Sequence, residues 1–434
     1  MPGAFRNVAT NKKKLIPLVG VLLGLCLVAV SVAVLTRQDR VYGLMIDAGS
    51  TGSRMHTFVF TKGSENNLQL ITEDFFALKP GLSNYKEDAK AASESLDPLL
   101  ARSRSIVPEH LHSSTPVYLR ATAGLRMLGP ELSENILREV RSKLKNSGFR
   151  FDSDNWASIL GGNDEGIYSW ITVNYLLNRA PSDTAGTLEM GGGSSQIAFV
   201  PREPNLKQEC NAASESIQYK GADLGLYTVS HLNFGLKKAK ADVLKSALSS
   251  KAKDHPCLNE GVTSVEIPFE DPPTKAELRG VGSFAACINV IDEVLMAGAG
   301  ECNCGICTYR GEPQPPATRD YVALAFYAER TTDLGLKNPV TMRDIRALGE
   351  KICKMSLAEV KARYPVVPNG EAADLCFDLA FIYQHLTDGH GIKEAKNAGE
   401  VEPKIQMVKK INGIELGWSL GAMFAEMSKL ESAN

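Results

Sequence analysis

Two short glycine- and serine-rich segments, each opened by a carboxylate, are the residues of this sequence best suited to phosphate chemistry. They run Asp47-Ala-Gly-Ser-Thr-Gly-Ser-Arg54 and Glu189-Met-Gly-Gly-Gly-Ser-Ser-Gln196. Glycine lets the backbone approach a phosphoryl group while amides and hydroxyls donate to its oxygens. The leading carboxylates are placed to hold a hydrated divalent cation that bridges two phosphates. One such segment is equally typical of a tight turn, but two of them, 142 residues apart, favour a two-phosphate site.

Hydrolysis of a phosphate also needs a base that activates water, and Glu165 is the candidate. It lies in the segment Gly162-Asn-Asp-Glu-Gly166, which opens a predicted helix. In a first helical turn the macrodipole stabilises the ionised carboxylate and keeps it ready to accept a proton. The alternative is an ordinary helix start capped by Asn163, and the residues alone favour it because acids are common there.

The elements around both glycine-rich segments follow one order. Apolar runs predict strands at 41–46 and 55–60 on either side of the first segment, and a strand at 116–120 leads into a short Ala-Thr-Ala-Gly stretch. The second segment, within 186–200, again joins a strand to a returning strand. This similarity predicts a duplicated α/β lobe of the actin-like or ribonuclease-H-like kind. Apolar periodicity predicts helices at 86–105, 131–146, 235–250, 283–297, 342–364 and 373–387, and a helix start within 414–424.

Composition places the chain among globular proteins with room for two domains. It has 434 residues, 44% of them hydrophobic and 23% charged, and a formal net charge of −2. The charge is uneven, since residues 1–40 hold six basic groups and one acidic group, which leaves −7 on the rest. So acidic a body has no diffuse basic face and predicts no nucleic-acid partner. Any phosphate must be bound by backbone amides, a few placed cations or a metal.

The N-terminal segment predicts a membrane anchor. Residues 15–35 carry no charge and follow three lysines at 12–14. The run is long enough to span a bilayer, and the basic flank favours a cytoplasmic tail over residues 1–14. A cleaved signal ending near Ser31-Val-Ala33 is the alternative, and cleavage stays open. In both cases we expect the body to be lumenal or extracellular.

Cysteine usage agrees with an oxidising compartment. Cys26 lies within the predicted anchor and leaves eight of the nine cysteines in the body. Cys257 with Cys287 and Cys353 with Cys376 are plausible disulfides. Four cysteines stay unassigned: Cys210, Cys302, Cys304 and Cys307. The last three form a close cluster, which a metal or redox site would also explain.

Five short regions together resemble the nucleoside triphosphate diphosphohydrolase family, the apyrases and lumenal nucleoside diphosphatases. In order they are Ile46-Asp-Ala-Gly-Ser-Thr-Gly-Ser-Arg54, Ala121-Thr-Ala-Gly-Leu-Arg126, Gly162-Asn-Asp-Glu-Gly166 with Trp170-Ile-Thr-Val-Asn174, Leu188-Glu-Met-Gly-Gly-Gly-Ser-Ser-Gln196 and Gly417-Trp-Ser-Leu-Gly421. The resemblance extends over about residues 41–427. The run Lys79-Pro-Gly-Leu-Ser83, the cysteine spacing and the single predicted anchor look most like the Golgi and ER guanosine and uridine diphosphatases.

The resemblance implies two ribonuclease-H-like (actin-like) lobes with the active site in the cleft between them. We expect lobe I at 41–160 plus 406–434 and lobe II at 161–405. The implied activity is metal-dependent removal of the terminal phosphate from UDP and GDP, with triphosphates as further candidates. Water attacks phosphorus directly and no phosphoenzyme forms. The implied location is a single-pass type II protein of the Golgi or ER, with secretion or the cell surface as alternatives.

The resemblance also implies a role for each matching residue. Glu165 would activate the attacking water, which Ser194 and Gln196 help to place. Asp47 and Glu189 would hold Ca²⁺ or Mg²⁺ through water. The residues expected close to the ion are Thr122 and Trp418, and those expected to bind phosphates are Gly49, Ser50, Thr51, Gly52, Ser53, Gly191, Gly192 and Gly193.

Two departures from the family pattern bear on activity and specificity. The second glycine-rich region of the family begins with Asp, whereas here Glu189 is one methylene longer, so a water-mediated metal contact would become direct or be lost. This keeps open an alternative function, a nucleotide-binding protein on the same fold with reduced or no turnover. Where relatives have an aromatic-rich run, this chain has Tyr321, Phe326 and Tyr327. They would stack on a nucleobase or else form part of the core.

Overall fold

The structure, a computed structural model, describes residues 40–63, 68–202, 214–269, 274–296, 311–317, 320–368, 370–395 and 402–432. It divides into a small unit, residues 1–42 and 59–71, and a large unit, residues 43–58 and 72–434. All site residues considered below belong to the large unit. The predicted anchor at 15–35 lies outside the described residues, and none of the helices described is long and apolar enough to cross a bilayer.

Two sheets share one strand order, which confirms the predicted α/β duplication. The first has the order β3-β2-β1-β4-β5 and the second β15-β14-β6-β7-β9-β8. Read from its other edge, the second repeats the first as β9-β7-β6-β14-β15, with β8 added. The strands of the first sheet are β1 (Arg40–Ala48), β2 (Ser53–Lys62), β3 (Leu68–Leu78), β4 (Val117–Ala121) and β5 (Ala157–Ile159). Those of the second are β6 (Gly186–Met190), β7 (Ser194–Phe199), β8 (Glu215–Tyr219), β9 (Ala222–Leu232), β14 (Tyr321–Ala325) and β15 (Ile405–Met407).

Strand direction and register place the two leading carboxylates at equivalent points. β1 runs parallel to β4 with Asp47 opposite Arg120, and β6 runs parallel to β14 with Glu189 opposite Leu324. Asp47 therefore lies near the carboxyl end of β1, and Glu189 lies near the carboxyl end of β6. Each of these strands is next to the middle parallel strand of its sheet, β4 or β14. After β4 the chain enters helix α4 (Ala123–Leu128), and after β14 it enters α10 (Phe326–Thr332). Such ends of parallel strands are where α/β folds bind ligands.

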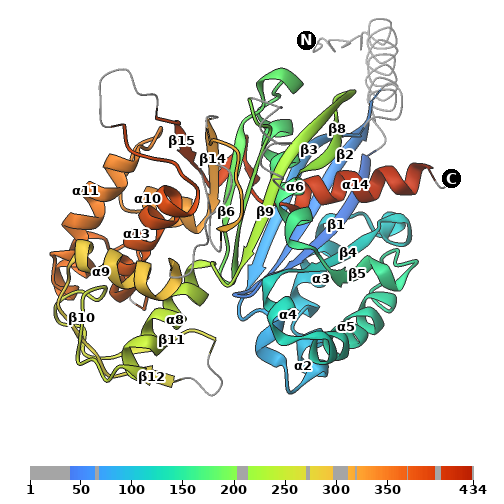
Figure 1. Cartoon of the computed structure of the whole chain (residues 1–434). Coiled ribbons are helices and arrows are strands. Elements are labelled where there is room, and N and C mark those ends of the chain that lie inside the picture. The colour runs from blue at the N-terminus through green and yellow to red at the C-terminus, as the bar shows by residue number, and fades with distance from the viewer. Residues whose placement is uncertain are drawn as a thin grey trace, which may run out of the picture. The chain divides into compact units, whose positions relative to one another are not determined.

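Helices surround both sheets (Figure 1). Around the first lie α2 (Ala89–Glu94), α3 (Asp97–Ile106), α4 and α5 (Pro130–Lys145). Helix α6 (Gly162–Leu176) packs on β6, β7 and β9 and lies beside the C-terminal helix α14 (Ser419–Ser432), as Figure 1 shows. The remaining helices of the second lobe are α8 (Leu236–Ser249), α9 (Phe284–Ile291), α11 (Met342–Cys353), α12 (Leu357–Arg363) and α13 (Leu375–Gln384).

Two predicted single helices are wrong, because each is a pair. The segment 86–105 divides into α2 and α3, and Pro98 lies in the first turn of α3, where its missing N–H removes no helical hydrogen bond. The segment 342–364 divides into α11 and α12. Ser356 and Glu359 form a capping box that starts the second helix. The helix start predicted within 414–424 is at Ser419, after the short strand β17 (Ile414–Glu415).

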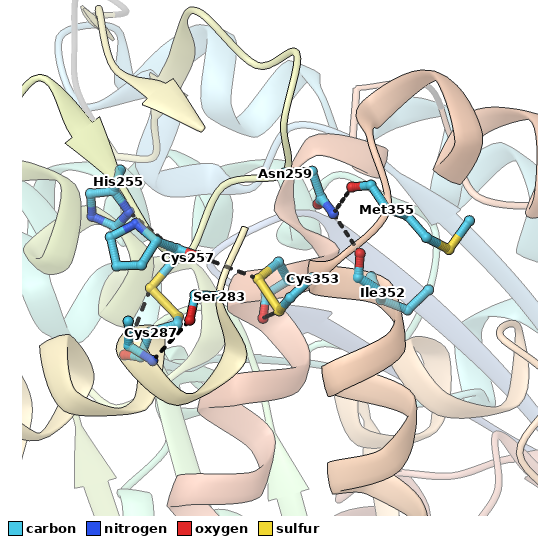
Figure 2. Close-up of a disulfide and its surroundings, with 11 residues drawn as sticks. His255, Cys257, Asn259, Ser283, Cys287, Ile352, Cys353 and Met355 are labelled. Carbon is cyan, nitrogen blue, oxygen red and sulfur yellow. Dashed lines mark hydrogen bonds between the residues drawn. A yellow bond between two sulfur atoms is a disulfide. The ribbon is translucent and has the colours of Figure 1, made fainter. Parts of the chain in front are cut away.

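Both predicted disulfides, Cys257–Cys287 and Cys353–Cys376, are confirmed. Figure 2 shows them close together near the end of α11. The Asn259 side chain donates to the carbonyls of Ile352 at 2.6 Å and Met355 at 2.9 Å. These bonds tie the loop after Cys257 to the end of α11. The other body cysteines, including the 302–307 cluster, lie outside the described residues.

Candidate active site

One cavity of the large unit is lined by residues from both sheets. The first lobe supplies Asp47 and the loop after it, and the second supplies Glu189 and the loop after it. Other residues on the cavity wall are Glu165 from α6, Thr122, Phe326, Glu329, Lys409, Glu415 and Trp418. Residues far apart in the sequence therefore meet at the carboxyl ends of β1 and β6.

The two glycine-rich loops adopt the same turn. Gly49 N–H donates to the Gly52 carbonyl at 3.0 Å, and Gly191 N–H donates to the Ser194 carbonyl at 2.9 Å. In both loops the donor and the acceptor lie at the same sequence separation from the leading carboxylate, Asp47 in the first loop and Glu189 in the second. A Cβ atom on Gly192 would lie 2.6 Å from Thr51 Cγ2 and 2.7 Å from Ser50 Oγ, so the loops face each other directly. The geometry suits two loops that close on one phosphate chain.

The backbone of each loop is in close contact with a further glycine, Gly81 at the first loop and Gly235 at the second. A Cβ atom on Gly81 would lie 2.3 Å from the Gly49 carbonyl oxygen, and one on Gly235 would lie 2.4 Å from the Ser194 amide nitrogen. Both distances are too short for any side chain, so only glycine allows these close backbone contacts. No sequence motif singled out Gly235. Gly81 was noticed only as part of the Lys79-Pro-Gly motif.

Most of the predicted phosphate-binding residues line the cavity, and two do not. Those on the wall are Gly49, Ser50, Thr51, Gly191, Gly192 and Gly193. The Gly52 carbonyl accepts the turn hydrogen bond, and Ser53 is buried at the start of β2 with 2% exposure. Neither Gly52 nor Ser53 is part of the cavity wall.

Glu165, Ser194 and Gln196 form one hydrogen-bonded group, together with an arginine that the sequence analysis missed. Arg126 Nη2 donates to Glu165 Oε2 at 2.9 Å and to Ser194 Oγ at 3.0 Å. Gln196 Nε2 donates to the same glutamate oxygen at 3.2 Å and to Ser194 Oγ at 2.9 Å. Arg126 ends the Ala121–Arg126 motif, so its place in a quoted motif was the available signal. The three residues expected to handle water are thus joined, with Gln196 bonded to both Glu165 and Ser194 and Arg126 bridging the same two.

Glu165 is placed by the start of α6. The helix begins at Gly162 with Gly161 as N-cap, so the cap expected at Asn163 is wrong. The Glu165 side chain is buried, with 6% exposure for the residue. Burial raises the pKa of Glu165 to about 7, although the adjacent Arg126 opposes the shift. A carboxyl group of this pKa exchanges protons near neutrality, as a general base must.

The two leading carboxylates have different partners. Arg54 Nη1 donates to Asp47 Oδ2 at 3.0 Å, while Asp47 Oδ1 is buried without a hydrogen-bond partner among the described residues. The Ser169 hydroxyl donates to Glu189 Oε2. Burial raises the pKa of Glu189 to about 8, and the nearby charge of Glu165 adds to the shift. Arg54 and Ser169 were not assigned roles from the sequence.

These oxygen atoms fit a hard divalent cation. Several buried carboxylates around one cavity repel one another, and one has an unsatisfied oxygen, so a cation there would offset both penalties. Carboxylate oxygen is the donor that Ca²⁺ and Mg²⁺ prefer. Among the described residues, no three His, Cys, Asp or Glu side chains converge closely enough to ligate one ion. Thr122 and Trp418, expected near the ion, both lie on the cavity wall.

Only one of the three aromatic candidates reaches the cavity. Tyr321 and Tyr327 are 1% and 0% exposed and belong to the core of the second lobe, the alternative that the sequence left open. Phe326 lines the cavity. Lys237 Nζ lies 5.6 Å and Arg330 Cζ 5.1 Å from the centre of its ring, which are cation–π distances.

A comparison with protein families identifies the family of this chain. The model of the GDA1/CD39 (nucleoside phosphatase) family matches residues 33–433. The chain belongs to this family. It is therefore an enzyme of the group that hydrolyses phosphates of nucleotides, as the resemblance predicted.

Curated relatives carry both names that the resemblance suggested. The chain is 32% identical to a guanosine-diphosphatase of Candida albicans over 440 residues, which covers 90% of this chain and 72% of that protein. It is 34% identical to an apyrase of Solanum tuberosum over 385 residues, 83% of each protein. A solved nucleoside triphosphate hydrolase of Neospora caninum matches with a TM-score of 0.60 at 16% identity, over 97% of this chain and 98% of that one. That likeness supports the two-lobed α/β fold alone.

Proposed function

We propose that this nucleoside phosphatase removes the terminal phosphate of nucleoside diphosphates, GDP and UDP, and of triphosphates, with Ca²⁺ or Mg²⁺ and with Glu165 as the base. The observation that carries the proposal is the Glu165 carboxylate, buried and bonded to Arg126 and Gln196 on the wall of a cavity with two phosphate-sized loops. Relatives named guanosine-diphosphatase and apyrase support the substrate class.

Neutral donors bind the phosphate chain in this proposal. The N–H groups of Gly49 and Gly191 close the two turns, and the loop amides of Ser50, Thr51, Gly192 and Gly193 donate to phosphate oxygens, together with the hydroxyls of Ser50 and Thr51. The lobes that contribute them are 41–160 plus 406–434 and 161–405. Such donors suit a body with a charge of −7, because they need no basic surface.

Asp47 and Glu189 would hold the divalent ion through water, with Thr122 and Trp418 on the cavity wall near it. When bound, the ion offsets the negative charge of the phosphates and of the carboxylates around the cavity. Ser169 holds one oxygen of Glu189, so the longer side chain is fixed despite its extra methylene. Glu189 therefore replaces the family aspartate without loss of the site.

Water is activated by the hydrogen-bonded group around Glu165. Ser194 Oγ accepts hydrogen bonds from Arg126 and Gln196, which leaves its own proton free to donate to water or phosphate. Glu165 takes a proton from the water as the oxygen attacks the terminal phosphorus in line. The leaving group departs on the opposite side, and no phosphoenzyme forms.

Two further assignments complete the proposal. Phe326 stacks on the nucleobase, since it alone of the predicted aromatic residues faces the cavity. The body lies in the lumen of the Golgi or ER, attached by an anchor at 15–35. The two disulfides and the 21-residue uncharged run support this location.

The test is phosphate release from GDP, UDP and ATP by the full chain, with and without a chelator, beside Glu165→Gln. The substitution keeps the shape of the side chain but removes the base, so we expect a loss of about 10²–10⁴-fold in kcat. Chelation should abolish turnover. Activity that survives both changes would refute the mechanism, and inactivity of the unaltered chain with retained nucleotide binding would favour the binding-protein alternative.

A further inference from the structure

A histidine on the cavity wall has a partner arrangement that the proposed mechanism does not use. His56 lies in β2, lines the cavity and is 4% exposed. Its Nδ1 atom lies 2.6 Å from Glu73 Oε1 in β3. The other oxygen of Glu73 accepts the Glu415 N–H at 2.7 Å, and the Glu73 side chain is 1% exposed. A buried carboxylate thus holds one nitrogen of an imidazole in a catalytic cavity.

This arrangement fixes the tautomer and the orientation of the ring. When Glu73 is ionised, its carboxylate only accepts hydrogen bonds, and Nδ1 then carries the proton of the pair. His56 makes no other hydrogen bond to a described residue, which leaves Nε2 available to a ligand. The ring is stacked with Phe58 at 5.7 Å and lies 5.1 Å from Phe75. A histidine held in this way is prepared to contact a ligand at a set position.

The position of His56 in the strand indicates which part of the ligand it meets. Side chains two residues apart in a strand share a face, so His56 follows Arg54, which bonds to Asp47 and Thr51 at the first loop. At strand spacing His56 lies roughly 7 Å further from that loop. Glu165 has partners in Arg126 and Gln196, none of which contacts His56. His56 is therefore not part of the hydrogen-bonded group around Glu165.

We propose that His56 Nε2 binds the phosphate of the leaving nucleoside monophosphate, and that Glu73 is its positioning residue. The inference rests on the proposed function, because it places the terminal phosphate between the two loops. An anion at Nε2 recruits a proton from solvent, so that the imidazolium donates to the phosphate oxygen.

Equilibrium binding measurements distinguish the contribution of His56 from that of the two glycine-rich loops. We would measure the affinity of the full chain for GMP, GDP and inorganic phosphate in Mg²⁺, before and after His56→Gln. Loss of a charge-assisted hydrogen bond should weaken GMP and GDP about tenfold or more. Inorganic phosphate should change by less than about twofold, because it needs only the loops. His112→Gln is the matched control, since His112 is bonded to the Val107 carbonyl and lies off the cavity wall.

Glu73→Gln gives a second test if His56→Gln does not fold. It keeps an acceptor for the Glu415 N–H but removes the charge that orients the ring, so GMP should again weaken while inorganic phosphate does not. Unchanged GMP affinity, or an equal loss for inorganic phosphate, would overturn the inference. A chain that binds and hydrolyses GDP but is insensitive to His56→Gln refutes this inference alone. A chain that binds neither GMP nor GDP refutes the proposed function with it.

Discussion

Replacing Arg126 with alanine should disable the site more than it unfolds the protein. The guanidinium, 14% exposed, donates to the Leu160 carbonyl at 2.8 Å, Glu165 Oε2 at 2.9 Å and Ser194 Oγ at 3.0 Å. It therefore joins the end of α4 to the start of α6 and to the second glycine-rich loop. Its removal leaves a buried carboxylate without its cation.

The expected effects have two parts. Breaking a buried ion pair from one side destabilises a protein by about 3–5 kcal/mol. The loss of two anchors from Glu165 and Ser194 displaces the groups that place water, and a displacement of about 1 Å lowers kcat by about 10²-fold. We therefore expect a lower unfolding midpoint together with a fall of about 10²-fold in kcat, at temperatures where the variant is folded.

Arg120→Ala is the matched control. Arg120 is also buried, pairs with Glu426 at 2.9 Å and donates to the carbonyls of Asn155 and Trp156, but it does not line the cavity. It should lower stability by a similar amount and leave kcat within a few-fold. Urea unfolding and steady-state GDP hydrolysis measure the two effects. An Arg126→Ala variant with kcat near that of Arg120→Ala would refute the positioning argument.

Three further predictions concern the metal, the disulfides and pH. Ser169→Ala should lower Ca²⁺ affinity about tenfold, since Ser169 orients Glu189. Calcium titration of the melting temperature measures this, and an unchanged affinity would show that the hydrogen bond is irrelevant to the ion. Removing both Cys257 and Cys287, which close a loop of 30 residues, should lower the unfolding free energy by about 3–4 kcal/mol, seen as a lower urea midpoint. An unchanged urea midpoint would contradict this prediction. Burial lowers the pKa of His255 from 6.5 to about 4. The unfolded chain therefore binds the proton first, and stability that is intact above pH 6.5 should fall by about 3 kcal/mol toward pH 4. His255→Gln should reduce that loss, and an equal acid sensitivity in the variant would contradict the assignment.

The duplicated loops show what local sequence can predict. Each combines a strand, a carboxylate and a glycine-rich turn, and all three are properties of neighbouring residues. The structure gives both loops the same hydrogen bond, from Gly49 to Gly52 and from Gly191 to Ser194. The two disulfides were also predicted, as plausible pairs among the eight cysteines of a body expected in an oxidising compartment.

The helix boundaries show where local periodicity is insufficient. The apolar pattern continues through 342–364, but Ser356 and Glu359 form a capping box that starts a new helix, a local signal that apolar periodicity does not register. Likewise Tyr321, Phe326 and Tyr327 have the same aromatic character in sequence. Burial of the two tyrosines against the second sheet left only Phe326 facing the cavity.

The sequence by itself determined the family, the two-sheet fold and the residues of both glycine-rich loops, because strand alternation, turn composition and motif spacing are all encoded locally. Only the tertiary structure decided which groups act together. Arg126 bonds to Glu165 and Ser194, Ser169 to Glu189, and Glu73 to His56. These are contacts between side chains on different strands, helices and loops. Their geometry depends on how the sheets and helices pack, which no local pattern specifies.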